Sequence, residues 1–224
     1  MIYLLILIIQ LVFLYFLSRK VLRRFYIFFY HFTKRKNWSV SLFAILFLPG
    51  TFIHEMSHFL AALFLLVPVG KIELLPKVNE TGQIDLGSVA IGKSDPLRRF
   101  LVGIAPVIFG FFIIVLILYL ITTPGFINTW WGYVLAGFLI FEIANSMFAS
   151  KKDLEGALGL LAFFVFIYIF MMLTGINFPF IKLEAVYSNE IIKMIQLANL
   201  FLIVPIFLDS FAFLLLKLVT KRYN

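Results

Sequence analysis

Hydrophobic residues in this chain gather into long, nearly uninterrupted runs that short polar segments separate. A helix needs about 17 to 25 apolar residues to cross a bilayer. Six runs come close to this length or reach it: residues 1–17, 39–67, 97–122, 130–149, 154–174 and 195–216. The second run contains Pro49-Gly50, which we expect to kink that helix just before His54. The pattern predicts an all-α polytopic membrane protein with about six transmembrane helices.

Two polar segments interrupt this pattern. The first carries a cluster of Lys and Arg residues between positions 19 and 36, and its middle, residues 24–32, mixes aromatic and charged side chains as an interfacial helix does. The second, residues 71–93, alternates partially on both sides of the turn signal at residues 79–82. It predicts a small β-hairpin or sheet at the membrane surface after the second helix.

The predicted helices and the hairpin group into three regions. We expect an N-terminal anchor helix with a basic linker in residues 1–38, and a three-helix core with the hairpin insertion in residues 39–157. The remaining residues, 158–224, form C-terminal transmembrane helices. No feature of the sequence predicts an oligomeric state.

Composition supports a protein whose main partner is the lipid bilayer. Hydrophobic residues make up 63% of the chain and charged residues 13%, against about half and about a quarter in soluble domains. The net charge of +8 fits basic ends on membrane helices, so we predict no nucleic-acid partner. The chain has no cysteine, so a transition metal would bind to His, Asp or Glu.

The segment His54-Glu55-Met56-Ser57-His58 is the strongest candidate for chemistry. On a helix the two imidazoles project from one face and can chelate one ion, and Glu55 lies close enough to take a proton from metal-bound water. Zinc fits such ligands because it accepts imidazole and carboxylate in tetrahedral geometry and leaves one position open for water. Ionisable groups within a membrane span are expensive, so function explains three of them in five residues better than packing does.

A catalytic zinc usually has three protein ligands. The remaining histidine, His31, lies in the basic linker, and we expect it at the surface. The candidate carboxylates are Glu142, Asp153, Glu155 and Asp209. Because successive spans alternate in direction, the ends of the second and fourth spans share one face, which favours Asp153 or Glu155. We expect Asp209 to face the helix bundle or a water-filled path.

These motifs resemble those of the site-2 proteases, which are intramembrane zinc metalloproteases. That family has His-Glu-x-x-His in one span and, in a later span, an Asn followed eight residues on by a zinc-binding Asp, the spacing that Asn145 and Asp153 share. The stretch of residues 103–106 is similar to part of the family's middle core helix, and the likeness covers residues 50–157. The chain departs from the family in lacking both prolines of the second motif.

The resemblance implies roles for these residues. His54, His58 and Asp153 would hold one zinc ion, with Glu155 as the alternative third ligand, and Glu55 would be the general base. Asn145 would donate its amide to the developing oxyanion or hold the substrate strand. The other interpretation of Asn145 is a hydrogen bond between membrane helices.

The function that follows is a zinc metalloendopeptidase of regulated intramembrane proteolysis, which cleaves transmembrane protein substrates. His58 lies about 13 Å below the end of its span at a rise of about 1.5 Å per residue, so the site is expected inside the bilayer. A substrate helix must unwind there, and residues 71–91 could receive the unwound strand by β-augmentation.

Two other functions use the same residues: a membrane metal transporter, or an inactive homologue that binds helices without cutting them. The resemblance implies an active site near the cytosolic side of the membrane. The basic cluster after the first run favours that linker inside, which would place the site on the opposite side.

Overall fold

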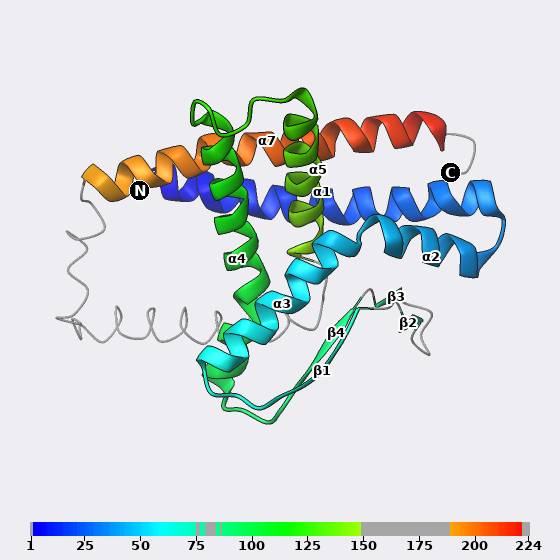
Figure 1. The fold of residues 1–224 in the computed structure, drawn as a ribbon, viewed down its shortest axis with the longest axis horizontal. Coiled ribbons are helices and arrows are strands. Elements are labelled where there is room, and N and C mark those ends of the chain that lie inside the picture. Colours follow the sequence, from blue (N-terminus) through cyan, green and yellow to red (C-terminus); the bar gives the residue numbers. More distant parts are fainter. Residues whose placement is uncertain (1, 75–76, 79–83, 86, 149–188, 221–224) are drawn as a thin grey trace, which may run out of the picture.

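The computed structural model describes residues 2–74, 77–78, 84–85, 87–148 and 189–220 (Figure 1). Its helices are α1 (Ile2–Thr33), α2 (Lys36–Leu46), α3 (Leu48–Phe64), α4 (Pro96–Thr122), α5 (Trp130–Ser146) and α7 (Asn189–Val219). Its strands are β1 (Val69–Glu73), β2 (Lys77–Val78), β3 (Ile84–Asp85) and β4 (Ser88–Ile91).

The protein is mainly helical and has helices of membrane length. Three of them, α1, α4 and α7, are long and apolar enough to cross a membrane, and the bent pair α2 and α3 makes a fourth if it counts as one span. Helix α5 is apolar but only 17 residues long. The predicted run at residues 154–174 lies outside the described residues. These helices are compatible with a membrane protein and account for the predicted runs at the other five positions.

Helix α1 differs from the prediction, because the anchor and the expected interfacial helix at residues 24–32 form one continuous helix. No Pro or Gly interrupts residues 2–33, and 32 residues extend about 48 Å at about 1.5 Å each. Helix α7 lies beside it along much of its length (Figure 1). Gln10 Nε2 donates to the carbonyl of Asn199 at 3.2 Å, and Asn199 Nδ2 donates to the carbonyl of Tyr3 at 2.9 Å.

The predicted kink in the second run exists, but it lies at Phe47, two residues before Pro49. There α2 ends, α3 begins, and the two helices meet at a bend of 68°. Pro49 has no N–H to donate, and its ring would clash with the carbonyl four residues earlier in a continuous helix. The proline is instead accommodated in the first turn of α3, where its missing N–H leaves no bond unmade.

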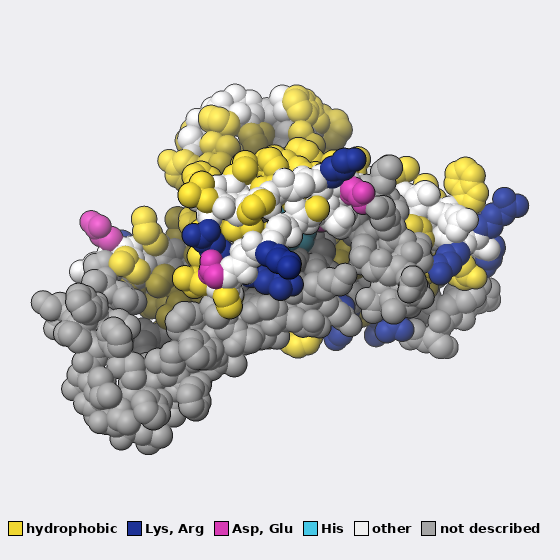
Figure 2. Space-filling model, turned by 90° about the horizontal axis from the view of Figure 1, so that it is seen from below, with side chains coloured by type: hydrophobic (Ala, Val, Ile, Leu, Met, Phe, Trp, Pro, Cys, Tyr) yellow, Lys and Arg dark blue, Asp and Glu magenta, His cyan; other side chains and the backbone are white. Residues whose placement is uncertain are grey.

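Four helices meet in the main hydrophobic core. Its buried members include Leu14 of α1, Ile114 of α4, Ile140 and Ile143 of α5, and Leu202 of α7. Large hydrophobic side chains also cover much of the described outer surface, and Lys and Arg side chains lie at several places on the face shown, among them the end of the molecule where α1 gives way to α2 (Figure 2). An apolar exterior around a packed apolar core is what lipid-facing helices require.

The predicted hairpin is confirmed. Strands β1 and β4 pair antiparallel, with Ile72 opposite Val89, and β2 pairs antiparallel with β3, with Val78 opposite Ile84. The hairpin connects α3 to α4 and extends along α3 in Figure 1. It therefore lies beside the helix that carries both candidate histidines.

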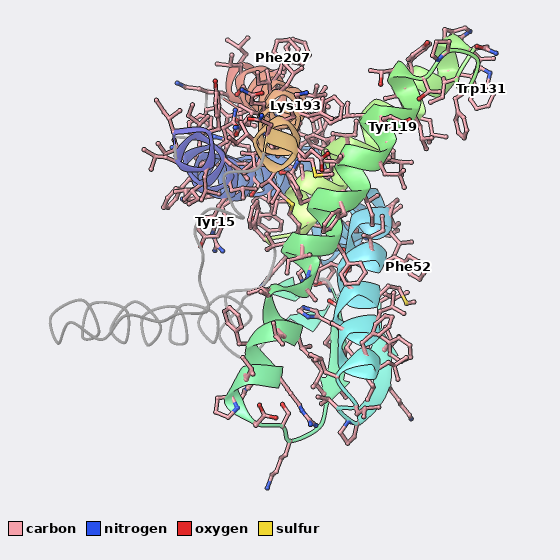
Figure 3. All side chains as sticks on the ribbon, turned by 90° about the vertical axis from the view of Figure 1, so that its left-hand side faces the viewer. Tyr15, Phe52, Tyr119, Trp131, Lys193 and Phe207 are labelled. Atoms are coloured by element: carbon pink, nitrogen blue, oxygen red, sulfur yellow. The ribbon has the colours of Figure 1, made fainter. Side chains whose placement is uncertain are left out.

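Helix α4 follows strand β4, begins at a charged segment beside the hairpin and ends at an aromatic one. Asp95 caps its first turn by accepting the backbone N–H of Arg98 at 3.0 Å, and this bond lowers the pKa of the Asp95 carboxyl below its ordinary value. At the other end the exposed Tyr119 and Trp131 lie far from the hairpin (Figure 3). Tyr and Trp are enriched where membrane helices meet the headgroups.

Candidate metal centre

The two imidazoles of the motif meet on one face of α3. His54 and His58 are four residues apart on the helix and are 5% and 4% exposed. Their Nε2 atoms lie 3.2 Å apart, and their rings stand nearly perpendicular, at 86°. The spacing expected from helical geometry is thus present in three dimensions.

This pair of nitrogen atoms fits zinc. Zinc binds imidazole nitrogen at about 2.0–2.1 Å, and two tetrahedral ligands at that distance lie about 3.3–3.4 Å apart. The observed separation of 3.2 Å agrees with that value without rearrangement of the helix. His54 and His58 can therefore supply two of the ligands of one ion.

Helix α4 orients the second histidine. Nδ1 of His58 lies 2.8 Å from the buried carbonyl oxygen of Val102. A carbonyl only accepts, so Nδ1 carries the hydrogen and donates it, which leaves the lone pair on Nε2. Metal-binding histidines are commonly held in this way, because the second hydrogen bond fixes both the tautomer and the ring.

Glu55 lies under the hairpin. Its side chain is 5% exposed and belongs to the buried face of α3. A methyl group at Gly87, just before β4, would lie 3.0 Å from Oε1 of Glu55 and 2.9 Å from Cγ2 of Thr51. The absence of a side chain at Gly87 is what lets the hairpin backbone approach the carboxylate so closely.

Glu142, a candidate ligand in the sequence, instead holds the start of α3. Its Oε2 accepts the backbone N–H of Gly50 at 3.4 Å, and the side chain is fully buried. Gly50 is in the first turn of α3, where N–H groups lack partners within the helix and favour negative charge. This contact joins α5 to the helix that carries His54, one turn further along.

Asn145 pairs with Asp209 of α7. Both side chains are fully buried, and Nδ2 of Asn145 donates to Oδ1 of Asp209 at 2.6 Å. The same nitrogen donates to the carbonyl of Phe141, one turn earlier, at 2.9 Å. The structure thus contains the hydrogen bond between helices that was the alternative to an oxyanion role for Asn145, and it confirms that Asp209 faces the bundle.

The two residues predicted as the third ligand lie outside the described part of the chain. Asp153 and Glu155 both lie in residues 149–188, which the structure does not describe. Within the described parts of the chain, no group of three His, Cys, Asp or Glu side chains converges to hold an ion. His31 lies near the end of α1, where its Nδ1 is 3.2 Å from Nζ of Lys34.

Sequence reasoning missed several residues that shape the centre. Val102 acts through its backbone carbonyl, so no side-chain pattern identifies it. Gly87 and Gly50 act through close approach, and the only available signal was the presence of glycine beside a strand and beside a proline. Glu142 carried a signal as an ionisable residue in an apolar run, but its partner depended on how α5 packs against α3.

The fold and the site together define a helical protein with apolar helices of membrane length, in which a bent helix presents two imidazoles at zinc spacing beside a buried carboxylate. Comparison of the chain with protein-family models, with curated proteins and with solved structures gave no match.

Proposed function

We propose that this protein is an intramembrane zinc metalloendopeptidase that hydrolyses peptide bonds in or near the transmembrane segments of other membrane proteins. The observation that carries the proposal is the pair of buried Nε2 atoms of His54 and His58, 3.2 Å apart, with Glu55 beside them. A transport or storage site needs only ligands, whereas hydrolysis also needs a base. A buried carboxylate next to the first imidazole meets that need.

Each residue of the site has its own role in this proposal. His54 and His58 would hold one zinc ion, and we propose Asp153 as the third ligand, with Glu155 as the alternative. When bound, the ion would supply Lewis acidity toward a carbonyl and a water molecule. Glu55 takes the proton from the attacking water and delivers it to the leaving amine. The carbonyl of Val102 keeps His58 in the tautomer that binds metal.

The surroundings of the site favour a membrane-embedded substrate. A transmembrane helix keeps its peptide groups hydrogen-bonded internally, so its carbonyls become available only where the helix unwinds. Strands β1 and β4 offer backbone edges to an unwound segment, and Gly87 brings the start of β4 against Glu55. A segment that adds to this sheet would therefore pass close to the general base.

We further propose that the protein crosses the membrane several times and that the site opens near the cytosolic side. The chain has no cysteine, so a single cysteine in place of Lys77 in β2 gives an unambiguous probe. In intact cells, protection of that cysteine from a membrane-impermeant maleimide supports the cytosolic side. Labelling of intact cells assigns the hairpin to the opposite side.

The function is tested by purifying the protein with Glu55→Gln and measuring zinc content together with cleavage of a single-span reporter. We expect zinc to be kept and cleavage to fall by at least about a hundredfold, the lower end of general-base contributions. Glu190→Gln, the same exchange at an exposed position in α7, is the control and should behave as the unmutated protein.

Histidine variants complete the test. His54→Ala and His58→Ala should each lose zinc, whereas His31→Ala should retain it because that residue lies near the end of α1 and both histidines of the centre are in α3. Absence of zinc from the unmutated protein would overturn the proposal. Zinc binding without cleavage would favour a transporter or an inactive helix-binding protein, and cleavage by Glu55→Gln would remove Glu55 as the base.

A further inference from the structure

Helices α1 and α7 run in the same direction and bring basic residues from both ends of the sequence together. Near its N-terminus α1 is hydrogen-bonded to the first half of α7, and further along Nη1 of Arg24 donates to Oγ1 of Thr220 at 3.2 Å. The two helices therefore lie side by side and parallel (Figure 1). Lys20 of α1 and Lys217 of α7 each lie about one turn before the contact between Arg24 and Thr220. The fold thus gathers two distant basic segments at one end of this helix pair.

Three cations at this end are exposed and have no acidic partner in the described chain. Lys20, Arg23 and Lys217 are exposed. Residues 1–54 and residues 210–224 contain no Asp or Glu. Within the parts of the chain that the structure describes, none of the three cations forms an ion pair. Their charge is therefore available to an anion from outside the chain.

The stability of helix α1 does not account for its two cations. Basic residues stabilise a helix through its dipole only near the C-terminus, within about the last turn. Arg23 lies about three turns before α1 ends at Thr33, and Lys20 lies further back. Only Lys217, in the last turn of α7, gains from the dipole of its helix.

On each helix a stripe of exposed apolar side chains leads up to these cations. The stripe on α1 has helical spacing, and all its members are at least half exposed: Leu5, Ile9, Val12 and Phe16. The stripe on α7 has the same character: Leu200, Ile203, Phe207, Phe211 and Leu214. Lys20 and Arg23 continue the first stripe at helical spacing, and Lys217 continues the second. The cations therefore stand at the end of two apolar surfaces.

The length of the stripes identifies the kind of partner. At about 1.5 Å per residue, Leu5 lies about 23 Å from Lys20 along α1, and Leu200 lies about 26 Å from Lys217 along α7. Both lengths fit within the hydrocarbon core of a bilayer, which is about 30 Å thick. A phospholipid matches the cations with its phosphate and the stripes with its acyl chains. An acidic protein segment would match the charge alone.

We propose that Lys20, Arg23 and Lys217 bind the phosphate of an anionic phospholipid whose acyl chains lie along the apolar stripes of α1 and α7. Ammonium and guanidinium groups donate charge-assisted hydrogen bonds to phosphate oxygens. Each Lys or Arg beside an anionic membrane surface strengthens binding about fivefold. The proposal uses no zinc chemistry, so it stands or fails separately from the proposed protease.

The test measures the affinity of the purified protein for a fluorescent phosphatidylglycerol, by anisotropy at a fixed concentration of neutral detergent. The triple variant Lys20→Gln/Arg23→Gln/Lys217→Gln should bind roughly a hundredfold more weakly, because three contributions of about fivefold multiply. The control variant removes three positive charges from exposed positions in α2, α4 and the start of α7, by exchange to Gln at Lys36, Arg99 and Lys193. It should bind as the unmutated protein does. An equal loss in both variants would mean diffuse attraction by net charge and would overturn the proposal.

Competitors identify the source of the phosphate. Unlabelled phosphatidylglycerol should displace the probe, whereas phosphatidylcholine and inorganic phosphate at the same concentration should not. Displacement by inorganic phosphate as effective as that by phosphatidylglycerol would show a site for free anions and overturn the lipid assignment. More effective displacement by a polyglutamate peptide would show an acidic protein partner and overturn it as well.

Two further measurements keep the result interpretable. Thermal unfolding establishes that each variant is folded. If the triple variant does not fold, Lys20→Gln and Lys217→Gln replace it, each with an expected loss of about fivefold, and unchanged affinity in both would refute the proposal. Glu55→Gln should bind the lipid as the unmutated protein does, so failure of the protease and failure of the lipid site are separate results.

Discussion

Gly50 is the position where a single methyl group should disturb the candidate centre most directly. It lies in the first turn of α3, where α3 contacts α5. A Cβ there would be 2.5 Å from the carbonyl oxygen of Glu142 and 2.9 Å from Oγ of Ser146. The serine side chain can rotate away, but the carbonyl belongs to the backbone of α5 and cannot. Gly50→Ala therefore forces the two helices apart.

The size of the effect follows from three contributions. Overpacking of this kind costs about 1–3 kcal/mol. Separation of the helices also breaks the hydrogen bond from the Gly50 N–H to the buried Glu142 carboxylate, which adds about 1–3 kcal/mol. Alanine gains at most about 1 kcal/mol over glycine in helix propensity. The balance is a loss of stability of about 1–5 kcal/mol.

The chain offers a matched control in Gly137, which is also a helical glycine and lies in the middle of α5. A methyl group there meets no atom within 4 Å, so Gly137→Ala keeps the gain in helix propensity without the clash. Thermal unfolding of both variants in detergent measures the difference, at about 2–4 °C per kcal/mol for a chain of this size. Gly50→Ala should unfold at least about 2 °C below the unmutated protein, and Gly137→Ala at or above it.

Zinc content of the same samples connects this contact to the site. Because His54 follows Gly50 by one helical turn, displacement of the start of α3 should also weaken zinc binding. If Gly50→Ala unfolds at the temperature of Gly137→Ala and binds zinc as well, the close packing of α3 on α5 is not a determinant of the site.

Three further predictions concern the hairpin and the helix contacts. Gly87→Ala should keep zinc and lose most reporter cleavage, because its methyl group meets the carboxylate of Glu55. Unchanged cleavage would mean that the hairpin does not restrict the position of Glu55. Asp95→Ala should lower the unfolding temperature at neutral pH. The helix-capping bond lowers the pKa of Asp95, so the stability that Asp95 contributes is present above its ordinary pKa of 3.8 and is lost as pH falls through its lowered pKa. Unfolding temperatures of both proteins over a pH series check this. A difference between them that stays constant down to the lowest pH would contradict it. Asn199→Leu removes the hydrogen bond to the Tyr3 carbonyl and should lower the free energy of unfolding by about 0.6–2 kcal/mol, measured by denaturant titration. An unchanged midpoint would show that this bond between α1 and α7 contributes nothing to stability.

Much of this protein follows from local pattern, because helical and strand periodicities need no information about distant residues. The four-residue spacing of His54 and His58 places both rings on one face wherever the helix lies, and in the structure their Nε2 atoms are 3.2 Å apart. Alternation around a turn signal predicts the hairpin in the same way, and run length predicts helix α4 to within one residue and the middle of helix α7, which begins six residues earlier than predicted. Pro49 predicts a break, although the bend is two residues earlier, at Phe47.

Partners across helices depended on the tertiary structure, because the angle and depth at which helices pack are set by many side chains at once. The sequence offered Glu142 and Asp209 as ionisable residues in apolar runs, and only packing assigned them to Gly50 and Asn145. Likewise the carbonyl that orients His58 belongs to α4, which follows α3 by more than thirty residues along the chain. The motif by itself thus determined which atoms can bind zinc, whereas the fold decided how those atoms are held and how closely the hairpin covers the base.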